Sequence, residues 1–93
     1  MDIEYDPHKD TANQLKHGVS LADAARMDFE HAIVVPDRRR DYGEARYLAA
    51  VPIDRRLHML AFTMRGAVLR VISLRRANSR EIAKYGKATS TDH

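Results

Sequence analysis

Residues 46–75, RYLAAVPIDRRLHMLAFTMRGAVLRVISLR, decide the fold class of this chain. They contain three apolar runs typical of β-strands: Arg46–Ile53, Leu57–Met64 and Ala67–Arg75. The runs are separated only by Asp54-Arg55-Arg56 and by Arg65-Gly66, and the second link predicts a two-residue turn in which glycine takes a positive φ. Links this short join antiparallel neighbours, so the stretch predicts a β-meander.

The segments before the meander predict two helices and two further strands. Asp6 followed by Pro7 resembles an N-cap and a first helical residue, and Gly18 marks a left-handed end, so a helix is expected over Pro7–His17. Ser20 begins a second helix with a capping-box pattern. Apolar alternation and β-branched residues predict the two strands: Asp2–Tyr5 and Ala32–Val35.

After the meander, Asn78 and Glu81 form a second capping-box pattern and begin a last helix, expected to end at Tyr85 before Gly86. Residues 87–93 have no apolar anchor and are expected to be a disordered tail. The fold class is therefore α+β: a small antiparallel sheet packed against two N-terminal helices, with a C-terminal helix. Ninety-three residues predict a single domain, over residues 1–86.

Charge is distributed unevenly along the chain. Residues 1–31 carry a net charge of −4 and residues 32–93 carry +7, with eleven arginines among the thirteen bases of the second part. Arginine binds phosphate with two parallel donors, so this distribution favours contact with phosphate or nucleic acid. The sequence has no cysteine, no apolar run of about 20 residues and no signal-peptide pattern. Disulfides, thiolate metal sites and membrane spans are therefore not expected, and we expect a cytoplasmic protein.

Strict alternation along Ala67–Arg75 places Arg70 on an otherwise apolar face with Ile72 and Leu74, while Ser73 and Arg75 end the opposite face. A charge among apolar side chains is costly unless it is paired. Arg70 therefore either pairs with an acid of the opening strand or helices, or flanks a phosphate groove together with Arg75.

Four arginines stand near the ends of adjacent predicted elements: Arg65, Arg75, Arg76 and Arg80. We expect their guanidinium groups to face one another across a shallow site.

Two further positions carry side chains suited to proton transfer or RNA contact. Lys16 and His17 occupy the last turn of the first helix, where they either complement the helix dipole or take part in acid–base chemistry. Tyr85 either lies at the edge of the core or contacts RNA. The histidines lack the spacing of a zinc site, so no metal or other cofactor is expected.

Five segments together resemble the BrnT toxin family: residues 4–9 (EYDPHK), 16–24 (KHGVSLADA), 41–46 (DYGEAR), 62–66 (FTMRG) and 69–77 (LRVISLRRA). Asn13, Arg80, Glu81 and Tyr85 also fit, so the resemblance covers about residues 2–86, with Leu74 where the family often has Ala. It implies a RelE-like endoribonuclease toxin of a bacterial toxin–antitoxin system, which cleaves RNA without a metal and inhibits translation. The implied partners are an RNA substrate and a BrnA-like antitoxin, which would itself supply any contact with operator DNA.

The resemblance also suggests roles for the candidate residues. Arg65 and Arg75 would stabilise the phosphate in the transition state, and Lys16, His17 and Tyr85 are candidates for proton transfer. Arg70, Arg76 and Arg80 would bind the RNA backbone. The alternative is a non-catalytic basic module that binds nucleic acid or protein.

Overall fold

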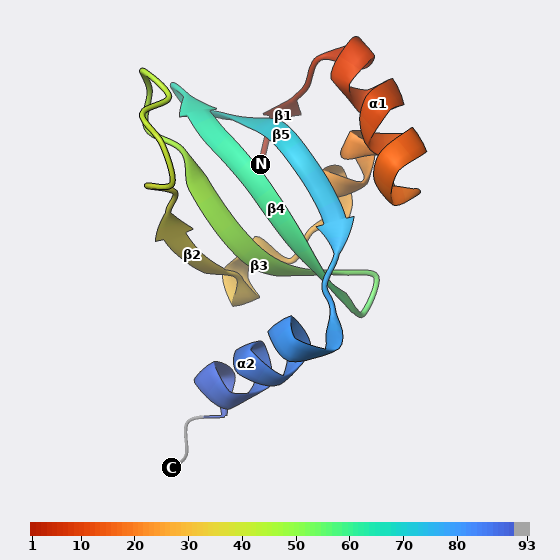
Figure 1. Cartoon of the computed structure of the whole chain (residues 1–93), viewed down its shortest axis with the longest axis vertical. Coiled ribbons are helices and arrows are strands. Elements are labelled where there is room, and N and C mark those ends of the chain that lie inside the picture. The colour runs from red at the N-terminus through yellow and green to blue at the C-terminus, as the bar shows by residue number, and fades with distance from the viewer. Residues whose placement is uncertain (91–93) are drawn as a thin grey trace.

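The fold is organised around one five-stranded sheet with the strand order β1-β5-β4-β3-β2, in a computed structural model that describes residues 1–90 (Figure 1). The strands are β1 (Ile3–Glu4), β2 (Ile33–Pro36), β3 (Tyr47–Ile53), β4 (Arg56–Arg65) and β5 (Val68–Arg76). Strands β2 to β5 pair antiparallel, as the meander predicted. Strand β1 pairs parallel with β5, so the sheet is mixed and the expectation of a purely antiparallel sheet is wrong.

Both tight turns of the meander occur, each with two residues. The β3–β4 turn places Asp54 and Arg55 at positive φ, and the β4–β5 turn consists of Gly66, with φ 63°, and Ala67. Arg65 is therefore the last residue of β4, paired with Val68, and not a turn residue as expected. Glycine has no Cβ to clash at positive φ, which makes it the natural first residue of such a turn.

A β-bulge in β5 changes which side chains share a face. Ala61 lies opposite Ser73 and Phe62 lies opposite Val71, so Ile72 has no partner in β4. The extra residue shifts the alternation, because two residues of one strand then oppose one of the other. Leu74 is consequently buried in the core, and the expected grouping of Arg70 with Leu74 is wrong.

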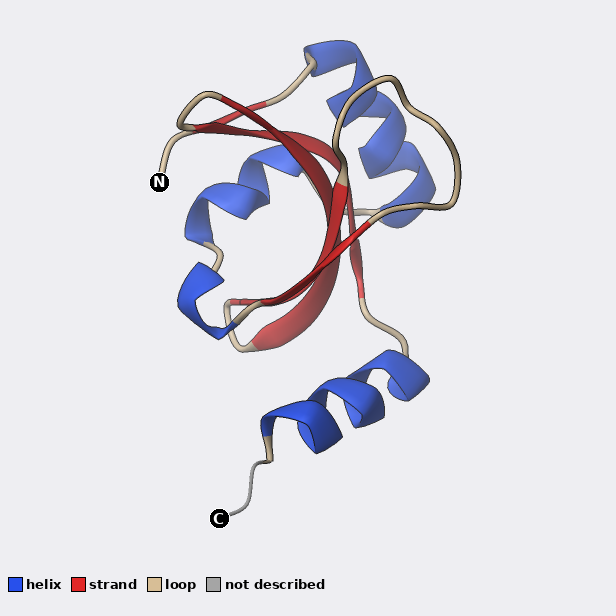
Figure 2. Cartoon of the chain, turned by 90° about the vertical axis from the view of Figure 1, so that its left-hand side faces the viewer, coloured by secondary structure: helices blue, strands red, loops and turns tan. Residues whose placement is uncertain are grey.

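Short helical segments cover one face of the sheet. Two 3₁₀ segments, η1 (Leu21–Arg26) and η2 (Phe29–His31), lie against it (Figure 2). The core between these layers combines residues of the η1 region with inward-facing residues of β3, β4 and β5: Val19, Leu21, Ala24, Ala49, Val51, Ile53, Leu60, Phe62, Leu69, Val71 and Leu74. Burying this apolar surface is the main favourable contribution to folding.

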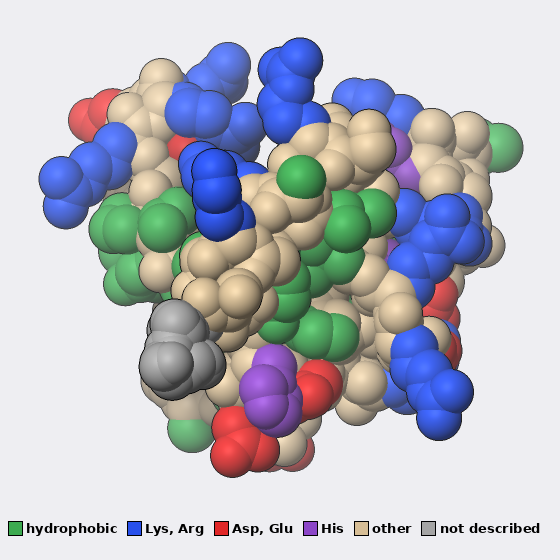
Figure 3. Space-filling model, turned by 90° about the horizontal axis from the view of Figure 1, so that it is seen from below, with side chains coloured by type: hydrophobic (Ala, Val, Ile, Leu, Met, Phe, Trp, Pro, Cys, Tyr) green, Lys and Arg blue, Asp and Glu red, His purple; other side chains and the backbone are tan. Residues whose placement is uncertain are grey.

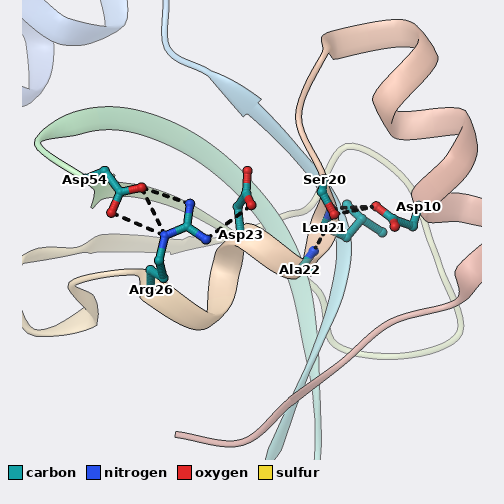
Figure 4. A network of polar contacts seen from close by, with 7 residues as sticks. All are labelled: Asp10, Ser20, Leu21, Ala22, Asp23, Arg26 and Asp54. Atoms are coloured by element: carbon teal, nitrogen blue, oxygen red, sulfur yellow. Dashed lines mark hydrogen bonds and ion pairs between the residues drawn. The ribbon is translucent and has the colours of Figure 1, made fainter.

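The second predicted helix exists as η1, a 3₁₀ segment. Polar contacts hold both of its ends (Figure 4). The Asp10 carboxylate accepts from Ser20 Oγ at 3.1 Å and from Leu21 N at 2.7 Å, and Arg26 bonds to the carboxylates of Asp23 and Asp54. A 3₁₀ segment rises about 2.0 Å per residue against 1.5 Å for an α-helix, so these six residues span more of the sheet.

The first α-helix, α1 (Pro7–His17), has the predicted ends: Asp6 accepts from His8 N, and Gly18 takes φ 70°. It lies along the outer edge of β5 instead of covering a face (Figure 1). Of the two N-terminal helices expected against the sheet, η1 covers a face, whereas α1 contacts the edge formed by β5. The reason is composition, because the only buried side chain of α1 is the polar Asn13.

The last helix, α2 (Ser79–Thr89), extends away from the end of β5 (Figure 1). Asn78 and Glu81 form the predicted capping box. The helix continues through Gly86, so the expected end at Tyr85 is wrong; Gly86 does not adopt a left-handed conformation. Residues 87–89 of the expected tail are helical, and residues 91–93 lie outside the described part of the chain.

The charged loop between β2 and β3 is held by its own side chains. The carboxylate of Asp37 accepts from Arg39 Nε and Nη2, each at 2.8 Å, and from Tyr42 Oη at 3.0 Å. These bonds, that from Arg39 above all, hold the pKa of Asp37 well below its usual range. Arg46 pairs with Glu44 at 3.1 Å and lies over the Tyr42 ring. The loop is also attached to the sheet, because the buried Thr63 of β4 donates its hydroxyl to Ala45 O at 2.6 Å.

Candidate active site

The site begins with the contact between α1 and β5. Strand β1 pairs only with Leu69 and Arg70, which leaves the rest of that edge of β5 without a neighbouring strand. Asn13 fills this gap: its Nδ2 donates to Leu74 O at 2.8 Å and its Oδ1 accepts from Leu74 N at 3.2 Å. The same Nδ2 donates to Val19 O at 2.8 Å. The last turn of α1 is thus fixed beside the second half of β5.

A hollow of about 220 Å³ lies at this contact. Its lining combines cationic and polar side chains of α1 with the bulge of β5: Lys9, Ala12, Asn13, Lys16, His17, Ile72 and Ser73. Lys16 and His17 are therefore brought together with Ser73, on the strand that also carries Arg75. The hollow offers two ammonium groups, from Lys9 and Lys16, together with an imidazole and a hydroxyl, to an anionic ligand.

His17 is the titratable group best suited to accept a proton here. Partial burial lowers its pKa from the usual 6.5, and the positive charges of Lys16 and Arg75 lower it further. Each of these effects disfavours the imidazolium. The lowered pKa favours the neutral ring, which is the state that a general base requires.

Arg75 is held in place by the first turn of α2. Its Nη1 and Nη2 donate to the two carboxylate oxygens of Glu81 at 2.8 and 2.7 Å, and Nη1 also donates to Arg76 O at 3.3 Å. The ion pair raises the pKa of Arg75 and lowers that of Glu81 to about 2. A guanidinium has five N–H donors, so the Nε–H and one Nη2–H remain for another ligand. Arg75 is thus paired and still able to bind phosphate.

Arg65 does not join this group. It pairs with Val68 at the beginning of β5, whereas Arg75 pairs with Met59 near the end of the strand. Seven residues of a strand cover about 20 Å, so the two side chains belong to opposite ends of the sheet. The expectation that Arg65 faces the other arginines across one site is therefore wrong.

The remaining predicted arginines fall into two groups. Arg70 pairs with Glu4 of β1 at 2.8 Å, which is the structural alternative that the sequence offered. Arg76 and Arg80 are exposed on either side of the short link to α2, and neither has an ion pair among the described residues. Both lie within a few residues of Arg75 along the chain.

Tyr85 lies in a different hollow. Its hydroxyl donates to His31 O at 2.5 Å, and its side chain faces β2 and β3 instead of α1. The structure therefore does not bring Tyr85 together with Lys16 and His17.

Sequence reasoning missed two residues of the site, Lys9 and Asn13. A signal was present, because Lys9, Asn13, Lys16 and His17 follow the spacing i, i+4, i+7 and i+8, which places them on one helix face. That face is polar, so the apolar periodicity that marks a buried helix face does not reveal it.

The chain matches the family model of BrnT, described as the ribonuclease toxin of a type II toxin–antitoxin system, over residues 5–81. It belongs to the BrnT family. The match includes every residue of the hollow and ends at Glu81, the partner of Arg75. No curated protein matches the sequence.

Membership of the BrnT family implies ribonuclease toxin activity and a protein antitoxin as partner.

Two further findings concern parts of the chain outside the hollow. Asp28, Glu30 and His31 have ligand atoms within 4.8 Å of one another and could hold a metal ion, but they lie in and beside η2, outside the hollow. No helix among the described residues has the length and apolar character needed to cross a membrane.

Proposed function

We propose that this chain is a RelE-like, metal-independent endoribonuclease, whose cleavage of RNA in the cytoplasm inhibits translation. The observation that supports this most strongly is that His17 and Lys16 line one hollow at the edge of β5, the strand that carries Arg75, whose charge acts on the imidazole. In this proposal they supply a base, an ammonium and a phosphate-binding group.

The proposed reaction is a transfer of the phosphoryl group within the RNA. His17 takes the proton of a ribose 2′-hydroxyl, and the 2′-oxygen forms a bond with the adjacent phosphorus. The bond from phosphorus to the 5′-oxygen breaks, and Lys16 protonates that oxygen. The products are a 2′,3′-cyclic phosphate and a 5′-hydroxyl. Arg75 binds the phosphoryl oxygens while negative charge develops on them.

The other predicted residues have supporting roles in this proposal. Arg76 and Arg80 continue the positive charge beyond Arg75 and bind the RNA backbone. Arg65 and Arg70 contribute to RNA binding at the other end of β5, outside the reacting centre. Tyr85 has no part in proton transfer, because its hydroxyl already donates to His31 O.

A BrnA-like antitoxin neutralises this activity in our proposal. The antitoxin forms a complex with the chain and carries any contact with operator DNA. The chain itself contributes the RNA-cleaving site.

The test is RNA cleavage by the purified chain in the presence of EDTA. We expect His17→Gln to reduce the cleavage rate about 100- to 10,000-fold, which is the usual contribution of general acid–base catalysis. His8→Gln is the matched control, because His8 is exposed at the beginning of α1 and away from the hollow. RNA that stays intact with a saturating amount of the wild-type chain would contradict the proposal.

The alternative, a basic module that binds nucleic acid without cleaving it, gives a different result in the same samples. Such a module would retain RNA with a steep salt dependence and leave it uncut. The cleavage products also test the chemistry, because a 3′-phosphate with no cyclic precursor would exclude attack by the 2′-hydroxyl.

A further inference from the structure

The face of the sheet opposite η1 and η2 carries an apolar groove, which we call the β2–α2 groove. It has a volume of about 310 Å³. The sheet contributes five apolar side chains from three strands: Ile33, Val35, Leu48, Ala50 and Met59. Helix α2 forms the other wall with Glu81, Lys84, Tyr85 and Ala88. Seen from below, hydrophobic side chains are exposed in the middle of this face, with Lys and Arg side chains toward the top and right of the view and Asp, Glu and His side chains along its lower margin (Figure 3).

The apolar side chains in and beside the groove are not fully covered by the rest of the chain. Val35 is 49% exposed and Ile82 of α2 is 50% exposed, while α2 itself buries no residue. Contiguous apolar surface of this kind on a small domain marks a site of interaction with another protein. Two of the three polar groups of its helical wall already have partners, because Glu81 binds Arg75 and the Tyr85 hydroxyl binds His31 O, which leaves Lys84. A small polar ligand would find few free partners there.

We propose that the β2–α2 groove is the docking site of the protein antitoxin, and that the docking segment combines apolar side chains with Asp and Glu. This inference rests on the proposed function. Charge complementarity supports it: Lys84 lines the groove, Arg80 and Lys87 stand beside lining residues of α2, and Arg38 closely follows Val35 along the chain. None of these four cations has an ion pair among the described residues.

Two other occupants fit the groove less well. A second copy of the chain, docked through the same surface, would bring these cations against their own equivalents. RNA would match the charge, but bases bind by stacking on aromatic side chains, and Tyr85 is the one aromatic residue in a lining that is otherwise mainly aliphatic.

The position of the groove also explains how docking would block the ribonuclease. Met59 lines the groove and lies directly opposite Arg75 in the ladder between β4 and β5. Glu81 lines the groove and holds the guanidinium of Arg75. A segment in the β2–α2 groove would therefore lie next to Arg75 and obstruct the approach of RNA. Neutralisation would follow from occlusion, with no contact to His17.

The experiment compares two exposed apolar positions on different sides of the molecule. Val35→Glu places a carboxylate in the groove, and Leu15→Glu places one on α1, where Leu15 is 86% exposed and outside the groove. The probe is the purified product of the reading frame adjacent to the gene of this chain. Calorimetry should show that Val35→Glu weakens binding about 30-fold and that Leu15→Glu changes it by less than about twofold.

A second measurement needs no substitution. With ¹³C-methyl methionine, the signal of Met59 should shift on addition of the probe, while that of Met64, at the far end of β4, should not. Unchanged binding by Val35→Glu, or an unshifted Met59 signal, would overturn the proposal. The proposal would also be overturned if Val35→Glu lost RNA binding while it retained antitoxin binding. The same holds if the wild-type chain were a dimer that Val35→Glu dissociates.

Cleavage assays on the same samples keep the two proposals apart. Val35→Glu should cleave RNA at the wild-type rate, because Val35 lies in the groove and outside the reacting centre. If the wild-type chain leaves RNA intact while Val35→Glu selectively loses the antitoxin, the docking site stands and the ribonuclease proposal fails.

Discussion

The two faces of the sheet are built differently. One face is sealed by η1 and η2 over a core of buried apolar residues, whereas the other is only half-buried along the β2–α2 groove, with α2 at its margin. The sealed face stabilises the fold, and the half-buried face is left available to partners. The candidate active site lies between them, at the edge of β5 where α1 replaces a missing strand. The predictions below test this division, beginning with the largest expected effect.

Adjacent residues of β4 give the sharpest comparison of the two faces. Leu60 is 1% exposed on the sealed face, and Met59 faces the groove. Leu60→Ala should lower the free energy of unfolding by about 4 kcal/mol, because it removes buried surface and leaves a cavity. Met59→Ala should lower it by about 1 kcal/mol, since its side chain remains partly in water. Urea denaturation measures both, and equal losses would mean that the half-buried face is also core.

The contact between α1 and β5 should give the next largest effect. Asn13→Ala removes three hydrogen bonds and leaves the Leu74 N–H and C=O and the Val19 carbonyl without partners. We expect a loss of about 3 kcal/mol in unfolding free energy, because unsatisfied buried groups are costly. Gln14→Ala is the control: its exposed amide makes a single bond, to Asp10, and its loss should cost about 0.5 kcal/mol. A small effect of Asn13→Ala would show that water replaces the amide.

Asn13 also marks the limit of what the sequence could predict. The meander, the helix caps at Asp6 and Gly18 and the capping box at Asn78 follow from local rules, and they were predicted correctly. The pairing of Asn13 with Leu74 joins residues 61 positions apart, and no local pattern encodes it.

The bulge at Ile72 is a second feature of the site that the sequence pattern does not encode. An extra residue cannot be recognised in an alternating apolar run. The predicted assignment of side chains to the two faces of β5 was therefore wrong beyond Val71. Lys16 and His17 could be named as candidates because polar residues at the end of a helix are visible in sequence, and the structure places both in the hollow. The separation of Arg65 from Arg75 depends on strand direction and length, which residue type alone does not reveal.

The Arg75–Glu81 pair should give a smaller, pH-dependent effect. Glu81 has a folded pKa of about 2 against the usual 4.5, so its stabilisation is complete above pH 4.5 and is lost as the pH falls towards 2. Glu81→Gln should therefore lower the unfolding free energy by about 1 kcal/mol at pH 7, a modest value because Arg75 is partly exposed. The unfolding free energies of the wild type and of Glu81→Gln, measured by denaturation at a series of pH values, should become equal near pH 2. A difference that persists there would assign the effect to the helix cap alone.

The smallest effect should come from the other attachment of α2, the bond from the Tyr85 hydroxyl to His31 O. Tyr85→Phe removes one exposed hydrogen bond, worth about 0.5 to 1 kcal/mol. Because α2 buries no residue, it should open separately from the sheet, so the loss should appear as faster hydrogen exchange of the α2 amides and not as lower global stability. Tyr47→Phe, which changes a ring stacked on Phe62 in the sealed core, should leave exchange in α2 unchanged. If Tyr85→Phe instead lowered the urea midpoint as much as it weakened α2, the helix would unfold together with the sheet, and the two faces would form one cooperative unit.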